Sequence, residues 1–174
     1  MEDLRYPLGQ FKPESTLTDK KRVECIQQIE AVPAALREAV KGLSMEQLDT
    51  PYRPGGWTVR QVAHHIPDSH MNAYIRFRLA LTEEQPTIKP YDQPLWAALP
   101  DAKAADVEMS LTLLEGLHKR WVSLLRAMKP EDFKRTYNHP ESGINTLENI
   151  LQMYAWHGRH HVAHITSLRK RMGW

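Results

Sequence analysis

The sequence lacks several features that would take it outside the ordinary globular proteins. It has one cysteine, Cys25, which excludes an intrachain disulfide and a zinc site built from several cysteines. No stretch approaches about 18 consecutive apolar residues, so no transmembrane helix is predicted. The N-terminal residues lack the basic segment and apolar run of a signal peptide. These absences predict a cytoplasmic protein with no membrane partner.

A strong charge of one sign is also missing. The chain has 23 Lys+Arg and 21 Asp+Glu, so its formal net charge is only +2. Such a balance provides no general field to attract nucleic acid, and we expect a small-molecule substrate instead. With 174 residues, of which 41% are hydrophobic, the chain can bury a sizeable core. Residues 1–174 are expected to form a single domain.

Strand-like alternation is nearly absent, and helix signals dominate. Capping-box patterns and apolar residues at helical spacing predict four long helices. They cover residues 19–40, 58–81, 104–128 and 146–172, with a short helical turn after Ser44. Pro33 and Pro67 fall inside the first two and are expected to kink them.

Two long connections separate these helices. Residues 85–100 hold four prolines and are predicted to form a long ordered loop, which we expect to cover a site or to mediate a dimer. Residues 133–145 form the second predicted loop. Four long helices with two long loops predict an all-α four-helix bundle, a fold that builds ligand and metal sites from facing helices.

Histidine is the one residue type in surplus. The chain has 9 histidines, where a frequency of about 2% would give about 4. Seven of them lie in two short windows, residues 64–70 and 157–164. The other two, His118 and His139, are interpreted as isolated surface or packing residues.

The second window contains two histidine pairs four residues apart, and such residues lie one helical turn apart on one face. An apolar stripe defines the buried face of this helix: Ile150, Tyr154, Ile165, Leu168 and Met172. At about 100° per residue, His161 lies about 10° from its centre, His157 about 50°, His164 about 70° and His160 about 110°. His157 and His161 are therefore the better ligand pair, and His160 is expected to face outward. Gly158 lies on the opposite flank, where a side chain is expected to crowd an ion or a substrate.

The first window is less decisive. His64 and His65 are adjacent and point about 100° apart. Extrapolation along a straight helix places His70, rather than His65, near the apolar stripe, although Pro67 disturbs the phase. The residues alone predict one ligand from this window without choosing it. Packing or hydrogen bonding remains the alternative to metal binding for both windows.

Three stretches resemble the DinB superfamily: Gly55–Ile66, Asp68–Phe77 and Tyr154–Ile165. The resemblance is strongest to its YfiT group of metal-dependent hydrolases, also described as BstA-type bacillithiol transferases, and extends over nearly the whole chain. It implies a four-helix bundle that holds one divalent metal ion per chain, zinc first and nickel second. It implies that the ligands are His65, His157 and His161, and it implies a homodimer.

Three histidine ligands leave a metal position open, which is the catalytic pattern. A hydrolase would use metal-bound water, whereas the alternative, a bacillithiol S-transferase, would use a metal-bound thiolate. A metal-binding scaffold without activity is a third hypothesis. Asp68 and Glu148 are acid/base candidates by proximity alone, with surface or capping roles as the alternative, so the catalytic residues stay unassigned. Cys25 is expected to be a core residue rather than a nucleophile.

Overall fold

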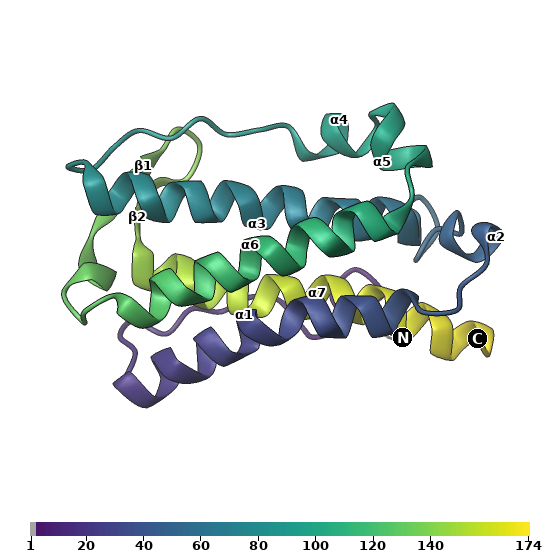
Figure 1. Cartoon of the computed structure of the whole chain (residues 1–174), viewed down its shortest axis with the longest axis horizontal. Helices are drawn as coiled ribbons and strands as arrows, with labels where there is room; N and C mark the ends of the chain where they lie inside the picture. Colours follow the sequence, from purple (N-terminus) through teal and green to yellow (C-terminus); the bar gives the residue numbers. More distant parts are fainter. Residues whose placement is uncertain (1–2) are drawn as a thin grey trace.

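Four long helices run side by side along the long axis of the molecule (Figure 1). They are α1 (Asp19–Val40), α3 (Val59–Thr82), α6 (Val107–Ala127) and α7 (Leu147–Met172). The computed structural model describes residues 3–174. The predicted four-helix bundle is confirmed, and a small two-stranded sheet accompanies it.

The bundle has a distinctive order of neighbours. α1 packs mainly on α6 and α7, and α3 packs on the same two helices. Figure 1 shows that α1 and α7 run in one direction along the molecule, whereas α3 and α6 run in the other. Because α3 and α7 are neighbours, side chains at their middles can meet inside the bundle.

Polar side chains begin the helices as the sequence predicts. Thr58 caps α3 in a capping box with Gln61, and Thr146 caps α7. Ser44 forms a capping box at the short helix α2 (Met45–Leu48). The first long helix begins at Asp19, with Thr18 as its cap. α1 and α3 continue as α-helices through Pro33 and Pro67, so neither proline ends its helix.

The prediction of a single loop over residues 85–100 is wrong. The segment contains α4 (Gln93–Ala97) and leads into α5 (Pro100–Ala104). The Asp92 side chain accepts a hydrogen bond from the Leu95 N–H at the start of α4. Pro94 and Pro100 lie in the first turns of the two helices, where the missing proline N–H has no consequence. The third long helix consequently begins at Val107 rather than Ala104, with Asp106 as its cap.

The second predicted loop also contains regular structure. It includes a 3-10 turn, η1 (Asp132–Lys134), and an antiparallel hairpin of β1 (Thr136–His139) and β2 (Gly143–Thr146). Gly143 has a φ of 75°, which a residue with a side chain rarely adopts, and it opens β2. Four-residue strands carry too short an alternation to be recognised from sequence.

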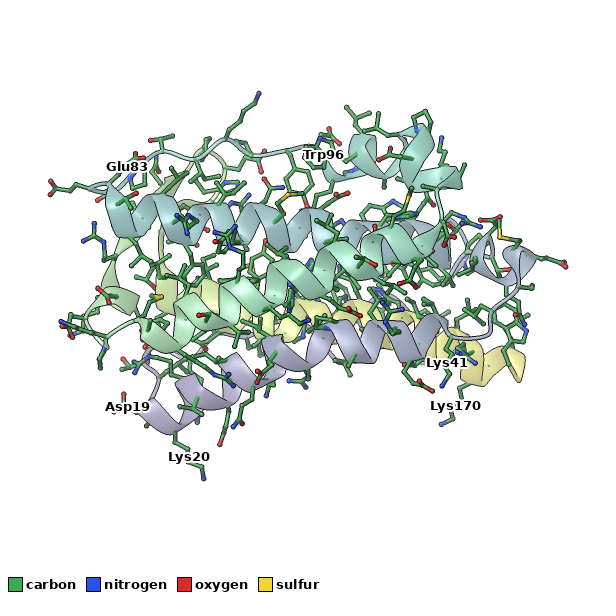
Figure 2. All side chains as sticks on the ribbon, viewed as in Figure 1. Asp19, Lys20, Lys41, Glu83, Trp96 and Lys170 are labelled. Atoms are coloured by element: carbon green, nitrogen blue, oxygen red, sulfur yellow. The ribbon has the colours of Figure 1, made fainter. Side chains whose placement is uncertain are left out.

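The bundle interior consists of two apolar clusters and also holds buried histidines. Figure 2 shows side chains filling the space between the long helices. One cluster includes Ile29, Phe77, Trp121 and Tyr154, and the other includes Val32, Ile66, Leu114 and Ile165. His70 and His118 are also buried inside the bundle. No helix within residues 3–174 has both the length and the apolar character needed to cross a bilayer.

Candidate metal centre

The structure brings together the three histidines that the sequence predicts as ligands. His65 comes from α3, and His157 and His161 come from α7. One ring nitrogen of each can be chosen so that all three lie within 4.8 Å of one another. Ring centroids are 4.5 Å apart for His157 and His161, and 4.7 Å apart for His65 and His161. One ion of ordinary size can therefore contact all three rings.

The ring nitrogens of this group suit a metal ion. Nε2 of His65 and Nδ1 of His161 are buried and have no hydrogen-bond partner within residues 3–174. Buried polar atoms without partners are costly, and a shared cation satisfies several at once. Within the described part of the chain, no fourth histidine, cysteine or carboxylate joins the group. A neutral donor set of this kind suits zinc or nickel and leaves coordination positions open.

Desolvation keeps these rings neutral, and a metal ligand must be neutral imidazole. Burial lowers the pKa of His65 to about 4. The pKa values of His157 and His161 lie well below the usual value, first because of burial and then because of neighbouring histidines. The group is ready to accept a cation at neutral pH without releasing protons.

A tryptophan covers one side of the centre. Trp57 immediately precedes the capping box that starts α3, and its ring centroid lies 4.8 Å from that of His65. The residues that begin the helix therefore also place an apolar wall against a ligand ring. This contact explains part of the Gly55–Ile66 motif, because Trp57 near its start packs against His65 near its end.

Three hydroxyl groups border the centre near His157. Ser69 Oγ lies 3.4 Å from His157 Nε2 and 3.2 Å from the Tyr154 hydroxyl. Tyr91, from the segment between α3 and α4, places its hydroxyl near Ser69. Burial raises the pKa of Tyr91 to about 12, and the Ser69 hydroxyl opposes that rise. Helical spacing could have indicated Ser69, four residues after His65, and Tyr154, three residues before His157, but not Tyr91, which reaches the site from a different segment.

The two acid/base candidates differ in their surroundings. Asp68 is half-buried one turn after His65, and burial raises its pKa to about 6, with a smaller contribution from Asp101. Glu148 instead accepts a hydrogen bond from Arg22 at 2.7 Å and lies in the first turn of α7. Glu148 therefore links helices, while Asp68 stays a candidate. Cys25, expected in the core, is only half-buried and packs against the edge of an apolar cluster.

Two further histidines extend from the centre into the bundle. Nδ1 of His157 lies 3.2 Å from Nε2 of His70, and Nδ1 of His70 lies 2.9 Å from Nε2 of His118. Nδ1 of His118 lies 2.7 Å from the Ile29 carbonyl oxygen. His118 is a packing residue, one of the two predicted possibilities, but it is not isolated. A signal was present, because His118 occupies the apolar stripe of α6 between Leu114 and Trp121. The predicted position of His70 on the buried stripe of α3 is confirmed.

The second histidine pair of α7 lies under the N-terminal arm, defined as residues 3–18. The prediction that His160 faces outward is wrong, since only 5% of it is exposed. Its ring stacks on Trp156, with centroids 4.2 Å apart, and Tyr6 of the arm lies 6.0 Å away. His164 Nε2 is 3.1 Å from the Arg5 carbonyl oxygen. A helical projection omits such an arm, so it misplaces the residues that the arm covers.

Gly158 has a different role from the expected one. A Cβ atom there would lie 2.5 Å from Val32 Cγ2 and 3.2 Å from His70 Cε1. The glycine thus allows α1 to approach α7 closely and leaves room for the His70 ring. A side chain at this position would crowd α1 and His70.

Known proteins similar to this chain include several that are named as metal-dependent hydrolases. A protein of Bacillus mycoides (strain KBAB4) and one of Bacillus cereus (strain 03BB102), both named "Putative metal-dependent hydrolase", are 58% and 59% identical over all 174 residues of both chains. YfiT from Bacillus subtilis, described as "a probable metal-dependent hydrolase with an unusual four-helix bundle topology", has 54% identity. Its structure superposes with a TM-score of 0.96 over 98% of each chain.

A more distant structure shares the fold alone. TT2238, a four-helix bundle protein, is 20% identical, with a TM-score of 0.60 over 84% of this chain and 98% of its own. The sequence profile of the DinB superfamily matches residues 28–165, which include all three candidate ligands. The resemblance seen in the sequence motifs is confirmed: the chain belongs to the DinB superfamily.

Proposed function

We propose that the protein is a metal-dependent hydrolase whose single divalent ion, zinc in the first instance, is held by His65, His157 and His161. The observation that carries the proposal is the group of three neutral rings whose ligand atoms lie within 4.8 Å of one another, with no fourth protein ligand among residues 3–174. A structural zinc site is normally closed by four protein ligands. An open site leaves space for water and substrate. The printed names of the relatives support the same class of activity.

The chemistry assigned to the metal is Lewis acidity: when bound, it lowers the pKa of coordinated water towards about 7. The protein supplies the remaining groups. The hydroxyls of Ser69 and Tyr91 border the centre and can donate hydrogen bonds to a polarised carbonyl or phosphoryl oxygen of the substrate. Tyr91 keeps its proton at neutral pH, because its pKa of about 12 lies far above that range.

Asp68 is our candidate for the general base. It lies three residues after His65 on α3, and its pKa of about 6 makes it largely a carboxylate at pH 7 while allowing it to hold a proton briefly. It would accept a proton from the attacking water and return it to the leaving group. Ser69, Tyr91 and Asp68 would then each have a role in hydrolysis, which favours an enzyme over a passive scaffold.

Hydrolysis is tested with purified, zinc-loaded protein and panels of esters, amides and phosphoesters. We expect turnover by the wild type and by His160→Ala, and its loss in His161→Ala, because only His161 belongs to the ligand group. Asp68→Asn should reduce the rate by about 100-fold or more while zinc content is unchanged. Silent panels with zinc-loaded wild-type protein would contradict the proposal.

The same experiment contains an arm for thiol transfer. Each reaction is repeated with bacillithiol and an electrophilic acceptor, and the conjugate is measured by mass spectrometry. Conjugate formation that requires both zinc and bacillithiol, with no hydrolysis in any panel, would replace the hydrolase by a thiol S-transferase. Zinc binding without either activity would leave a metal-binding scaffold.

A further inference from the structure

We propose that His70 and His118 are positioning residues that fix the tautomer and orientation of His157. The inference rests on the proposed function, because His157 is one of the proposed ligands. Neither residue has a role in the hydrolytic scheme, yet both are buried, with 0% and 2% of their surfaces exposed. A fully buried polar side chain with no role in the reaction needs a structural reason.

The reason begins at a proline on another helix. In an α-helix, the N–H of residue i donates to the carbonyl of residue i−4. Pro33 has no N–H, so the Ile29 carbonyl receives no hydrogen bond from that position in α1. His118 reaches across from α6 and lies 2.7 Å from the same oxygen through Nδ1. The carbonyl freed by Pro33 thereby gains a donor from a neighbouring helix.

A carbonyl oxygen accepts but never donates, and this sets the direction of every later hydrogen bond. His118 must carry its proton on Nδ1, so its Nε2 is an acceptor when the ring is neutral. His70 then donates from Nδ1 to His118 across 2.9 Å and is itself protonated there. Its Nε2 accepts from Nδ1 of His157 across 3.2 Å. The chain of hydrogen bonds assigns the Nδ1–H tautomer to all three rings.

The consequence for the metal centre is the state of His157 Nε2. With its proton held on Nδ1, His157 has a free lone pair on Nε2, beside Ser69 and the group of ligand rings. Metal-binding histidines generally donate their other N–H to a fixed acceptor, which sets tautomer and ring orientation. Here the acceptor is a second histidine, which is itself fixed by a third. Because the chain ends at a carbonyl, it holds protons in place and does not deliver them to solvent.

The packing around His70 supports the same role. Gly158 leaves room for this ring, since a Cβ there would come within 3.2 Å of His70 Cε1. Trp121 and Tyr154 meet the His70 ring edge-on, with centroids 5.8 Å and 5.1 Å away. The ring is confined on several sides, so its hydrogen-bonding direction is well defined.

The first test reads the tautomers directly in metal-free protein. Long-range ¹H–¹⁵N correlation spectra of histidine-labelled wild-type protein distinguish Nδ1–H, Nε2–H and doubly protonated rings. At pH 7.5 with a chelator present, we expect Nδ1–H for His70, His118 and His157. An Nε2–H or doubly protonated form of any of the three would overturn the inference. The outcome does not depend on whether the protein binds a metal.

The second test measures zinc affinity by competition with a chromophoric chelator. His118→Leu removes the acceptor for His70, so we expect the zinc Kd to rise by about 10- to 100-fold, as is usual when the partner of a ligand histidine is lost. His118→Gln keeps an acceptor near the position of Nε2 and should stay within about threefold of the wild type. His139→Gln, in β1, serves as the matched control for loss of a histidine.

The two proposals fail in different ways. Zinc binding of His118→Leu at wild-type affinity, in folded protein, would overturn the positioning role and leave the ligand assignment intact. No zinc binding by wild-type protein would overturn the proposed function, while the tautomer spectra would still decide the hydrogen-bond chain. If His118→Leu fails to fold, His118→Gln is compared with the wild type in both measurements. Loss of zinc affinity in His118→Gln, with the tautomer of His157 unchanged, would contradict the inference.

Discussion

The two histidine pairs of α7 have the same spacing and different surroundings. His157 and His161 meet His65 of α3, and their ring nitrogens converge. His160 and His164 meet aromatic rings instead: His160 stacks on Trp156, and His164 stacks on Tyr52 with centroids 4.1 Å apart. His164 also donates to the arm through the Arg5 carbonyl. Both pairs leave buried ring nitrogens without a hydrogen-bond partner within residues 3–174, namely Nδ1 of His161 in one and Nδ1 of His160 and His164 in the other, but only the first pair converges with a third histidine.

The difference shows that i, i+4 spacing allows two histidines of one helix to share an ion but does not decide which pair converges with a third ligand. The selection comes from what faces each side of the helix. α3 supplies a third imidazole to one side, and the arm supplies a carbonyl and a tyrosine ring to the other. Both sides keep their histidines neutral by burial, so pKa alone does not separate them.

The largest expected effect is on metal content. Alanine at His65, His157 or His161 removes one of three ligands, and we expect bound zinc to fall from about one ion per chain to less than about a tenth after dialysis. His160→Ala and His164→Ala should keep about one ion per chain. Elemental analysis of the five variants, with circular dichroism to show that each is folded, gives the comparison.

Two results would break the contrast between the pairs. Full zinc content in all three ligand variants would reject the assigned centre. Loss of zinc in His160→Ala and His164→Ala, with the other three unaffected, would move the site to the arm side of α7.

The sequence predicts the long helices well because each begins with a side-chain cap and keeps a 3.6-residue apolar period. α7 begins after Thr146, as predicted. The sequence predicts the short elements on either side of α6 less well. α4, α5 and the two strands span only four or five residues each. Elements this short depend on contacts with the bundle rather than on their own periodicity.

The candidate site is likewise predicted only in part by the sequence. The helical projection selects His157 and His161 because both lie near a long apolar stripe. It cannot choose His65, since that choice depends on how α3 is rotated against α7. It also fails for His160, because the arm that covers this residue is far away in sequence. The apolar stripe of α6 indicates that His118 is buried, but it cannot indicate the hydrogen-bond partners, because Ile29 and His70 lie on two other helices.

The next effect concerns the face of α7 at Gly158, where α1 approaches closely. Gly158→Ala places a Cβ 2.5 Å from Val32 Cγ2, so we expect the free energy of unfolding to fall by about 1–3 kcal/mol, the usual result of overpacking. Urea denaturation measures it. In protein that already carries Val32→Ala, Gly158→Ala should lower the free energy of unfolding by less than it does in the wild type. A double-mutant cycle measures the difference.

Gly116→Ala is the matched control, since a Cβ there meets nothing within 4 Å and Gly116 lies inside α6. Gly116→Ala should raise the free energy of unfolding by about 0.5–1 kcal/mol, because alanine reduces the conformational freedom of the unfolded chain. An equal change in stability for the two glycines would contradict the close α1–α7 contact.

A smaller effect is expected from the arm side of α7. His164→Ala removes a stacked ring pair and a hydrogen bond to the arm, so metal-free protein should lose about 1–2 kcal/mol of unfolding free energy. Zinc should stabilise this variant as much as it stabilises the wild type, because the ligand group is untouched. Thermal unfolding with and without zinc separates the two quantities. A variant of wild-type stability that responds weakly to zinc would reverse the roles of the two pairs.

The smallest effect is the pH dependence contributed by Asp68 on the metal side, because Asp68 is only half-buried and solvent screens its charge. Its folded pKa of about 6 lies above the ordinary value of 3.8, so between these values the folded state binds more protons than the unfolded state. Stability contributed by this group is therefore present below about pH 4 and lost as the pH rises through 6. Asp68→Asn should be more stable than wild type at pH 7.5, and the gain should vanish near pH 4. Urea denaturation of both metal-free proteins at these two pH values measures the gain.

Asp101→Asn is a second comparison. It should reduce the stability lost between pH 4 and pH 7.5 only slightly, since Asp101 contributes less than burial to the raised pKa of Asp68. A gain that is larger at pH 4 than at pH 7.5 would mean that the folded protein holds Asp68 as a stabilised carboxylate, and Asp68 would then no longer qualify as the base of the metal side.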